Sequence, residues 1–257
     1  MTQAPPLVAV AHGSKDPRAA ASTEGLLAVT RARAAGLNVR TAFLDHAAPS
    51  LPQVLGSLAP EHSRCVVVPL LLASAYHAKA DIPGQIAKIR SACPGLDVVL
   101  ADALGPHPAL LAALDQRLGE AWGGPRSETS VVLAAAGSSD PAANAVNAAL
   151  APRLRALGGW RRVVTAYASA ASPAPAEAVA ALRGDGPVIV ATYLLAPGYF
   201  ADKIRDTSLA AGAAAVSAPL GAHPGAADVI IGRYRSENLR FRTDHRVPLV
   251  TRVPHTG

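Results

Sequence analysis

The chain has 257 residues, half of them hydrophobic and only 16% charged, a composition that excludes a disordered protein and suffices for two small packed domains. No apolar stretch approaches the roughly 18 residues of a membrane span, and no basic leader is recognisable, so we expect a cytoplasmic protein without a membrane partner. The net charge of +6 comes mostly from arginine, while aromatic residues make up only 4%; this disfavours a nucleic acid partner and leaves an acidic small molecule.

The first half of the chain alternates short apolar runs with longer helix-compatible stretches. The predicted strands are residues 7–11, 38–44, 65–71 and 97–101, and the predicted helices are residues 17–35, 50–58, 82–91 and 107–121. The apolar runs are continuous rather than alternating, which is typical of parallel strands buried on both faces. We therefore expect a doubly wound α/β domain over residues 1–124.

The second half repeats this order of elements. Its predicted strands are residues 131–135, 162–167, 188–194 and 213–217, and the glycine-rich stretch 123–127 predicts a linker between the halves. The sequence thus predicts a tandem duplication, with a second α/β domain over residues 125–235. A basic tail, expected to be partly ordered at best, follows over residues 236–257.

One pair of repeated segments keeps its turn and loses its histidine. His12-Gly13-Ser14 aligns with Ala136-Gly137-Ser138 at an offset of 124 residues (136 − 12), and an Asp-Pro pair follows in both copies. Three further pairs of segments align in the same order with a slowly shrinking offset. Ser14 survives as Ser138, so we expect it to belong to the turn rather than to act as a nucleophile.

Two more side chains that could handle a metal or a proton are absent from the second copy. Asp45 aligns with Ser169, and His77 aligns with Phe200 or Gly198, depending on the placement of a short gap. His12, Asp45 and His77 follow the first three strands, and ligands of open parallel sheets bind beyond the carboxyl ends of the strands. This asymmetry predicts one active site, on the first domain.

For other histidines and cysteines the sequence favours structural roles over metal binding or catalysis. His107 and His223 occur in both copies beside a proline that opens a helix, so we expect them to cap or pack. Cys65 and Cys93 are too far apart for a CxxC metal motif and are expected to be reduced, packed thiols. The chain contains no GxxxxGK[ST] or GxGxxG fingerprint, so no nucleotide is implied.

Four segments in order carry a family resemblance. They are His12-Gly13-Ser14 with Pro17, Phe43-Leu44-Asp45 with Pro49, residues 70–75 leading to His77 and Asp81-Ile82-Pro83, and Leu104-Gly105-Pro106-His107-Pro108. Together they resemble the CbiX/SirB family of ATP-independent sirohydrochlorin chelatases over most of residues 7–235. The resemblance implies two similar α/β lobes with the tetrapyrrole in the cleft between them.

The resemblance also implies a reaction and its residues. The enzyme would insert Fe²⁺, which we favour, or Co²⁺ into sirohydrochlorin for sirohaem or cobalamin biosynthesis, with no cofactor besides this substrate metal. His12 and His77 match the family's two metal-handling histidines, and Asp45 stands where the family usually has glutamate. Ser14, Lys15, Arg18 and Lys79 lie beside these motifs and are candidates for binding the carboxylates of the substrate. We expect a monomer or a homodimer.

The residues leave two other functional classes to distinguish from a chelatase. A non-catalytic carrier of metal or tetrapyrrole would use the same pocket, and only turnover separates it from a chelatase. A histidine phosphatase would need an arginine before the histidine, and Ala11 stands there instead.

Overall fold

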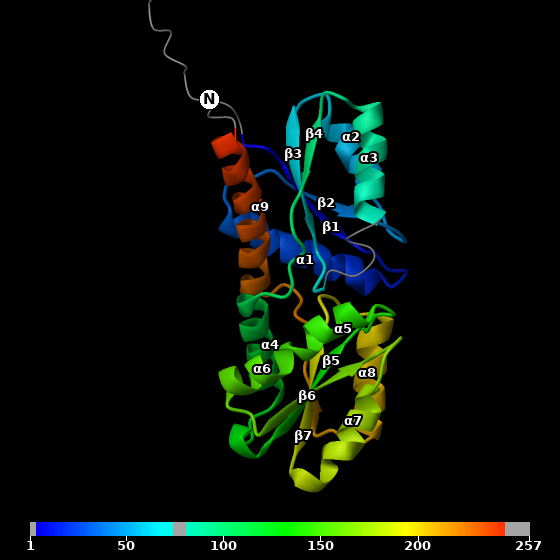
Figure 1. Ribbon diagram of the computed structural model, residues 1–257, viewed down its shortest axis with the longest axis vertical. Coiled ribbons are helices and arrows are strands. Elements are labelled where there is room, and N and C mark those ends of the chain that lie inside the picture. Colours follow the sequence, from blue (N-terminus) through cyan, green and yellow to red (C-terminus); the bar gives the residue numbers. More distant parts are fainter. Residues whose placement is uncertain (1–3, 74–80, 245–257) are drawn as a thin grey trace, which may run out of the picture.

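Each half of the chain builds one parallel four-stranded sheet (Figure 1). The computed structural model describes residues 4–73 and 81–244, so His77 and Lys79 lie outside the described residues. The first sheet has the order β2-β1-β3-β4 and consists of β1 (Leu7–Ala11), β2 (Val39–Phe43), β3 (Arg64–Pro69) and β4 (Asp97–Leu100). The second has the order β6-β5-β7-β8 and consists of β5 (Ser130–Ala135), β6 (Arg162–Tyr167), β7 (Val188–Tyr193) and β8 (Ala215–Val216).

The strand registers confirm the duplication. Val8 pairs with Val67 in the first sheet, and Val132 pairs with Val190 in the second. These pairs correspond at offsets of 124 (132 − 8) and 123 (190 − 67), as the sequence alignment requires. β1 is fully buried over its first four residues and β5 over its whole length, because helices cover both faces of each sheet.

Helices fill the connections between the strands. Those of the first half are α1 (Pro17–Arg33), α2 (Leu51–Leu58), α3 (Ile82–Ala92) and α4 (Pro108–Ala121). Those of the second half are α5 (Pro141–Ala148), α6 (Leu150–Gly158), α7 (Pro175–Leu182), α8 (Tyr199–Ala210) and α9 (Pro224–Asp244). No helix in the described part of the chain is both long and apolar enough to cross a membrane.

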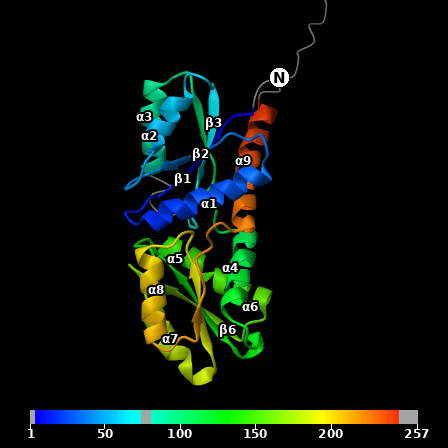
Figure 2. The same ribbon diagram turned by 180° about the vertical axis from the view of Figure 1, so that it is seen from behind.

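The last helix of each half packs on the sheet of the other half. α4 contacts β7 and α6 of the second half, and Asp115 on α4 accepts a hydrogen bond of 2.8 Å from the Trp160 indole. α9 contacts α1 and β3 of the first half, and Tyr234 on α9 donates to the Pro5 carbonyl at 2.8 Å. Figures 1 and 2 show both crossings, with α9 beside the first sheet and α4 beside the second.

The expected domain boundaries divide the sequence into its two repeats, and the exchange shows how these repeats interlock in space. A boundary at residue 124 separates the halves of the sequence, but in space α4 belongs to the second lobe and α9 to the first. Residues 236–244 of the expected basic tail continue α9, and residues 245–257 lie outside the described residues. The largest hydrophobic cluster contains residues of both sheets, including Leu7, Val66, Leu133 and Ile189, so the lobes share one core.

Candidate functional site

The loop after β1 is built by its own short polar residues. The Ser14 hydroxyl accepts a hydrogen bond of 3.1 Å from the Asp16 backbone N–H, and the Asp16 carboxylate caps α1 by accepting from the Arg18 N–H at 2.9 Å. Ser138 and Asp140 repeat both bonds at the start of α5, at 3.0 and 2.9 Å. The repeated motif is therefore a turn and a helix cap, and Ser14 has the turn role expected of it.

A glycine brings the loop after β2 against this turn. Gly13 has φ +92°, and a Cβ there would lie 1.7 Å from the Asp45 carbonyl oxygen. The Asp45 N–H donates to the His12 carbonyl at 2.9 Å, so the two loops are hydrogen-bonded directly beside the glycine. Gly137 meets the Ser169 carbonyl in the same way, with a Cβ distance of 1.9 Å. The scaffold around the site is thus present in both repeats.

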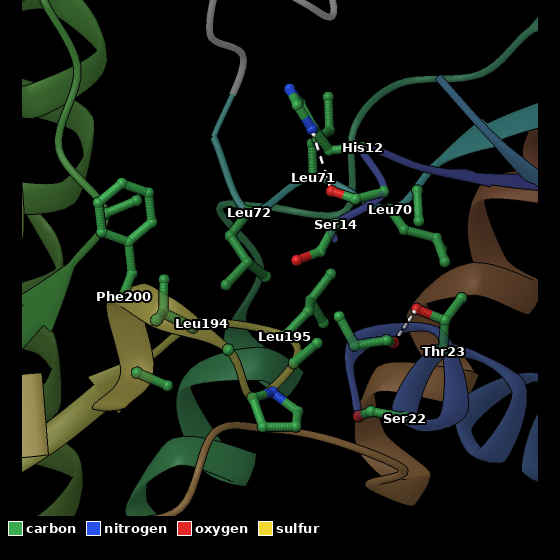
Figure 3. A pocket seen from close by; sticks show the side chains of 18 of the residues that line it. His12, Ser14, Ser22, Thr23, Leu70, Leu71, Leu72, Leu194, Leu195 and Phe200 are labelled. Carbon is green, nitrogen blue, oxygen red and sulfur yellow. Dashed lines mark hydrogen bonds between the residues drawn. The ribbon is translucent and has the colours of Figure 1, made fainter. Parts of the chain in front are cut away.

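A cavity of about 660 Å³ lies between the two repeats, at the carboxyl ends of both sheets (Figure 3). The first repeat contributes residues 11–15, His46 and residues 70–73, and the second contributes residues 135–138 and 193–201. The α1 and α5 faces close it with small side chains such as Ala19 and Ala143. Its volume is that of a site for a sizeable organic ligand.

The chemical groups of this cavity are unevenly distributed. Most of its wall is apolar, with Leu70, Leu71 and Leu72 from the first repeat and Leu194 and Leu195 from the second, as Figure 3 shows. His12 and His46 line it from the first repeat, and Ala136 stands at the position of His12 in the second. Among the lining residues that the structure describes, both histidines therefore belong to one half.

His12 lies where the sequence predicts it, at the end of β1 and on the cavity wall. Its Nδ1 is 3.3 Å from the Gly13 carbonyl oxygen, which fixes one side of the ring. The side chain is half-buried, so it is held by the loop and still accessible from the cavity. This placement suits a residue that ligates a metal or accepts a proton.

Asp45 is not among the residues that line the described cavity, so its expected contact with the metal alongside His12 stays a prediction. Its side chain is 66% exposed, and its carboxylate lies 3.4 Å from Nε2 of His46. It also accepts from the His46 backbone N–H at 2.7 Å. The carboxylate therefore acts on His46, which is the residue of this loop that lines the cavity.

His46 is a site residue that the sequence reasoning missed. It has φ +61°, and Ala170 has φ +56° at the equivalent position, so both repeats keep an unusual turn and only the first carries an imidazole on it. The signal that selected His12 was therefore available for His46, since each aligns with an alanine in the second copy.

The expected substrate-binding cations behave differently from one another. Lys15 is exposed and lines the cavity, together with Ser14. Arg18 does not line it, and its guanidinium pairs with Asp16 and with Asp202 of α8. This pairing lowers the pKa of both carboxyl groups, chiefly through the side-chain hydrogen bonds from Arg18. Arg18 therefore links the two repeats through its two carboxylate partners, and its expected contact with the substrate stays a prediction.

The remaining titratable candidates have structural roles in the described part of the chain. Nδ1 of His107 accepts from the Ala109 N–H at 3.1 Å, and Nδ1 of His223 accepts from the Gly225 N–H at 3.0 Å, so both cap helices. Burial raises the pKa of the Cys65 thiol to about 12, which leaves it protonated and unreactive. Within residues 4–73 and 81–244, no three His, Cys, Asp or Glu side chains form a metal cluster.

Comparisons with known proteins agree with this architecture. The CbiX family model matches residues 6–121 and 130–237. The chain is 31% identical over 167 residues to a sirohydrochlorin ferrochelatase of Priestia megaterium, covering 64% of this chain and 63% of the relative. It is 27% identical over 203 residues to a sirohydrochlorin cobaltochelatase of the same organism, covering 77% of this chain and 66% of the relative.

A solved structure shows the same fold. SirB from Bacillus subtilis, determined with Fe³⁺, superposes with a TM-score of 0.82 at 24% identity, covering 92% of this chain and 96% of that one. The α/β class with two parallel sheets is therefore confirmed. The chain spans just under two thirds of the length of the two curated relatives above.

Proposed function

Since the chain belongs to the CbiX family, we propose that it is a sirohydrochlorin chelatase, which inserts Fe²⁺ or Co²⁺ into sirohydrochlorin without ATP. The observation that carries the proposal is the cavity between the repeats, whose two histidines both come from the first repeat. The names of the relatives, a ferrochelatase and a cobaltochelatase, support the substrate and both metals.

The donor set suits the reaction. A divalent ion that enters a free-base tetrapyrrole replaces two pyrrolic N–H protons and loses its water ligands. Neutral imidazoles ligate borderline divalent metals and accept protons near neutral pH. His12 and His46 offer ring nitrogens to the same cavity, so one can hold the ion while the other takes up a proton. His77, which lies outside the described residues, is proposed as a further ligand on the family resemblance alone.

Asp45 is proposed as the group that orients His46 and passes protons to solvent. Its carboxylate is close to the His46 ring and mostly exposed, so a proton taken up by the imidazole has a short path to water. Aspartate is one methylene shorter than the glutamate usual in the family. The neighbouring histidine compensates for that shorter reach, because it extends from the same loop into the cavity.

The charge of the cavity rim favours an acidic ligand. Lys15 stands exposed beside the cavity with its ammonium available to substrate carboxylates. Ser14 adds a hydroxyl on the same loop, although that hydroxyl already accepts one backbone hydrogen bond. Lys79 completes the proposed set by sequence position. The apolar leucine walls are suited to the flat faces of the macrocycle and exclude water from them.

The direct experiment is anaerobic incubation of the purified protein with sirohydrochlorin and either Fe²⁺ or Co²⁺, followed by the absorption change on metal insertion. We expect insertion with both ions, faster with Fe²⁺, and well above the rate without protein. Insertion no faster than the protein-free rate would contradict the proposal. If sirohydrochlorin still bound with its spectrum perturbed, that result would favour the carrier function.

A further inference from the structure

Two aromatic side chains stand at the edge of the cavity without being packed into a core. Tyr199 is 73% exposed and Phe200 is 39% exposed, and both line the cavity. Their rings form an edge-to-face pair with centroids 5.5 Å apart. Among the described side chains these are the exposed aromatic ones, whereas Phe43, Tyr193 and Trp160 are at least 96% buried.

The exposure of two adjacent aromatic rings at the edge of a cavity suggests that they bind a ligand there. A phenylalanine or tyrosine ring buries roughly 150–250 Å² when it packs, and leaving it in water forgoes that stabilisation. An aromatic pair at a cavity edge is a surface on which a flat conjugated ligand can stack. The chain has few aromatic residues, so their pairing at this one place is informative.

The repeat alignment relates Phe200 to a histidine of the first repeat. The strand registers give an offset of 123 between β3 and β7, and this offset, carried forward in the sequence, pairs Phe200 with His77 (200 − 77), which is one of the two alignments that the sequence leaves open. In this alignment the second repeat has a phenyl ring where the first has an imidazole, and it has Ala136 where the first has His12. One copy retains groups for the metal, and the other offers groups for an aromatic ring.

The aromatic pair is linked to the His12 loop through the two helices that follow them. Phe200 and Tyr199 open α8 directly after Gly198, whose φ of +146° favours glycine. One turn later, Asp202 pairs with Arg18 in the first turn of α1, the helix that follows the His12 loop. This ion pair joins the start of α8 to the start of α1 and so connects the two walls of the cavity.

We propose that Tyr199 and Phe200, which we call the aromatic platform, stack against the tetrapyrrole and hold one part of its ring system while His12 approaches the pyrrolic nitrogens from the other repeat. Figure 3 shows Phe200 and His12 on different walls of the cavity. The proposal rests on the proposed function and assigns the second repeat its share of it: binding of the substrate ring rather than metal chemistry.

The test is the binding of metal-free sirohydrochlorin to the full-length protein, followed by its fluorescence or absorption, which needs no turnover. We expect Phe200→Ala to raise Kd about tenfold, equivalent to about 1.4 kcal/mol, and Tyr199→Ala to raise it less, because Tyr199 is the more exposed ring. Phe200→Trp, which keeps an aromatic face, should restore binding to near the wild-type value.

Leu209→Ala is the matched control, since Leu209 is an exposed apolar residue on the same helix that does not line the cavity. Its Kd should equal that of wild type. Equal Kd values for Phe200→Ala, Phe200→Trp and wild type would overturn the platform. Wild-type protein that binds sirohydrochlorin but inserts no metal would contradict the chelatase proposal and leave the platform standing, whereas wild-type protein that binds no sirohydrochlorin would overturn both.

Discussion

At the scale of single residues, the site depends on glycines that let two loops touch. Gly13 combines a positive φ with a carbonyl in the space of a Cβ, and Gly137 has the same two properties in the second repeat. Gly36 has a comparable φ of +82° with nothing within 4 Å of a Cβ. Substitutions at Gly13 and Gly36 therefore distinguish the energetic cost of a steric clash from that of a strained backbone conformation alone.

We predict that Gly13→Ala lowers the free energy of unfolding by roughly 3 kcal/mol, while Gly36→Ala lowers it by only about 1 kcal/mol. The difference is the displacement of the Asp45 carbonyl and of the His12–Asp45 hydrogen bond. Urea unfolding of both variants measures it. Equal losses would show that the two loops are not in contact at Gly13.

His46 gives a second prediction at this scale. If Asp45 acts through the His46 ring, both His46→Ala and Asp45→Ala should lower kcat about ten- to a hundredfold, and the double variant should lose little more than either single one. Steady-state rates of metal insertion for the three variants form the required cycle. Fully additive losses would mean that the two residues act independently.

At the scale of elements, two histidines cap helices, and their contribution to the stability of the fold depends on pH. Burial, followed by the charge of Arg233, lowers the pKa of His107, and burial, followed by the charge of Arg117, lowers the pKa of His223. Each ring accepts a backbone hydrogen bond on Nδ1, which only an unprotonated Nδ1 can do. The folded state thus favours neutral rings, and their stabilising contribution is present above the unfolded pKa near 6.5.

We therefore predict that the free energy of unfolding falls as the pH drops from about 7.5 to about 5.5, because the unfolded chain takes up protons that the folded rings resist. Replacing both residues by asparagine keeps a capping acceptor without titration, so His107→Asn/His223→Asn should flatten this part of the profile. Chemical denaturation of the wild type and of the double variant across this pH range measures the difference. A profile unchanged by the double substitution would place the acid sensitivity elsewhere.

Much of the element order could be predicted from the sequence, since continuous apolar runs mark the buried parallel strands and Asp-Pro marks the starts of α1 and α5. One break was missed. The counterpart of α1 is divided into α5 and α6 at Ala149, because Pro152 has no N–H to continue the helix from Ala148. The exchange of α4 and α9 was also missed, because an apolar helix face does not reveal which sheet it will cover.

Only part of the candidate site could be predicted from the sequence. Comparison of the repeats identified His12, because both repeats keep the same turn and only the first has a histidine on it. It could not show that Asp45 turns to solvent while His46 faces the cavity, because that depends on a left-handed residue at position 46. Nor could it show that Arg18 is matched by Asp202, which is 184 residues away in the chain.

At the scale of the whole molecule, the exchanged helices make the two lobes interdependent. The residues that α4 buries, Leu110, Leu111, Leu114 and Leu118, belong to the cluster that contains both sheets. In the isolated fragment 1–124 these side chains would lose the second sheet, and the first sheet would lose α9. The sequence halves are therefore not folding units.

We predict that fragment 1–124 alone lacks a cooperative thermal transition and binds a hydrophobic dye, whereas mixing it with fragment 125–257 restores cooperative unfolding. Circular dichroism during heating provides the measurement, with the intact chain as the reference. A sharp, two-state transition for fragment 1–124 alone would contradict the exchange.

We propose that the duplicated scaffold keeps its metal chemistry in the first repeat and uses the second repeat as a binding wall. The most direct measurement is the anaerobic rate of Fe²⁺ insertion into sirohydrochlorin for His12→Ala and for Ser169→Ala, the latter at the position of Asp45 in the second repeat. Ser169→Ala removes only the 3.1 Å hydrogen bond to the Ala136 carbonyl. From this assignment we expect His12→Ala to lower kcat by about a hundredfold or more and Ser169→Ala to retain most of the wild-type rate. A His12→Ala variant with near wild-type kcat, or a Ser169→Ala variant that is folded but inactive, would contradict it.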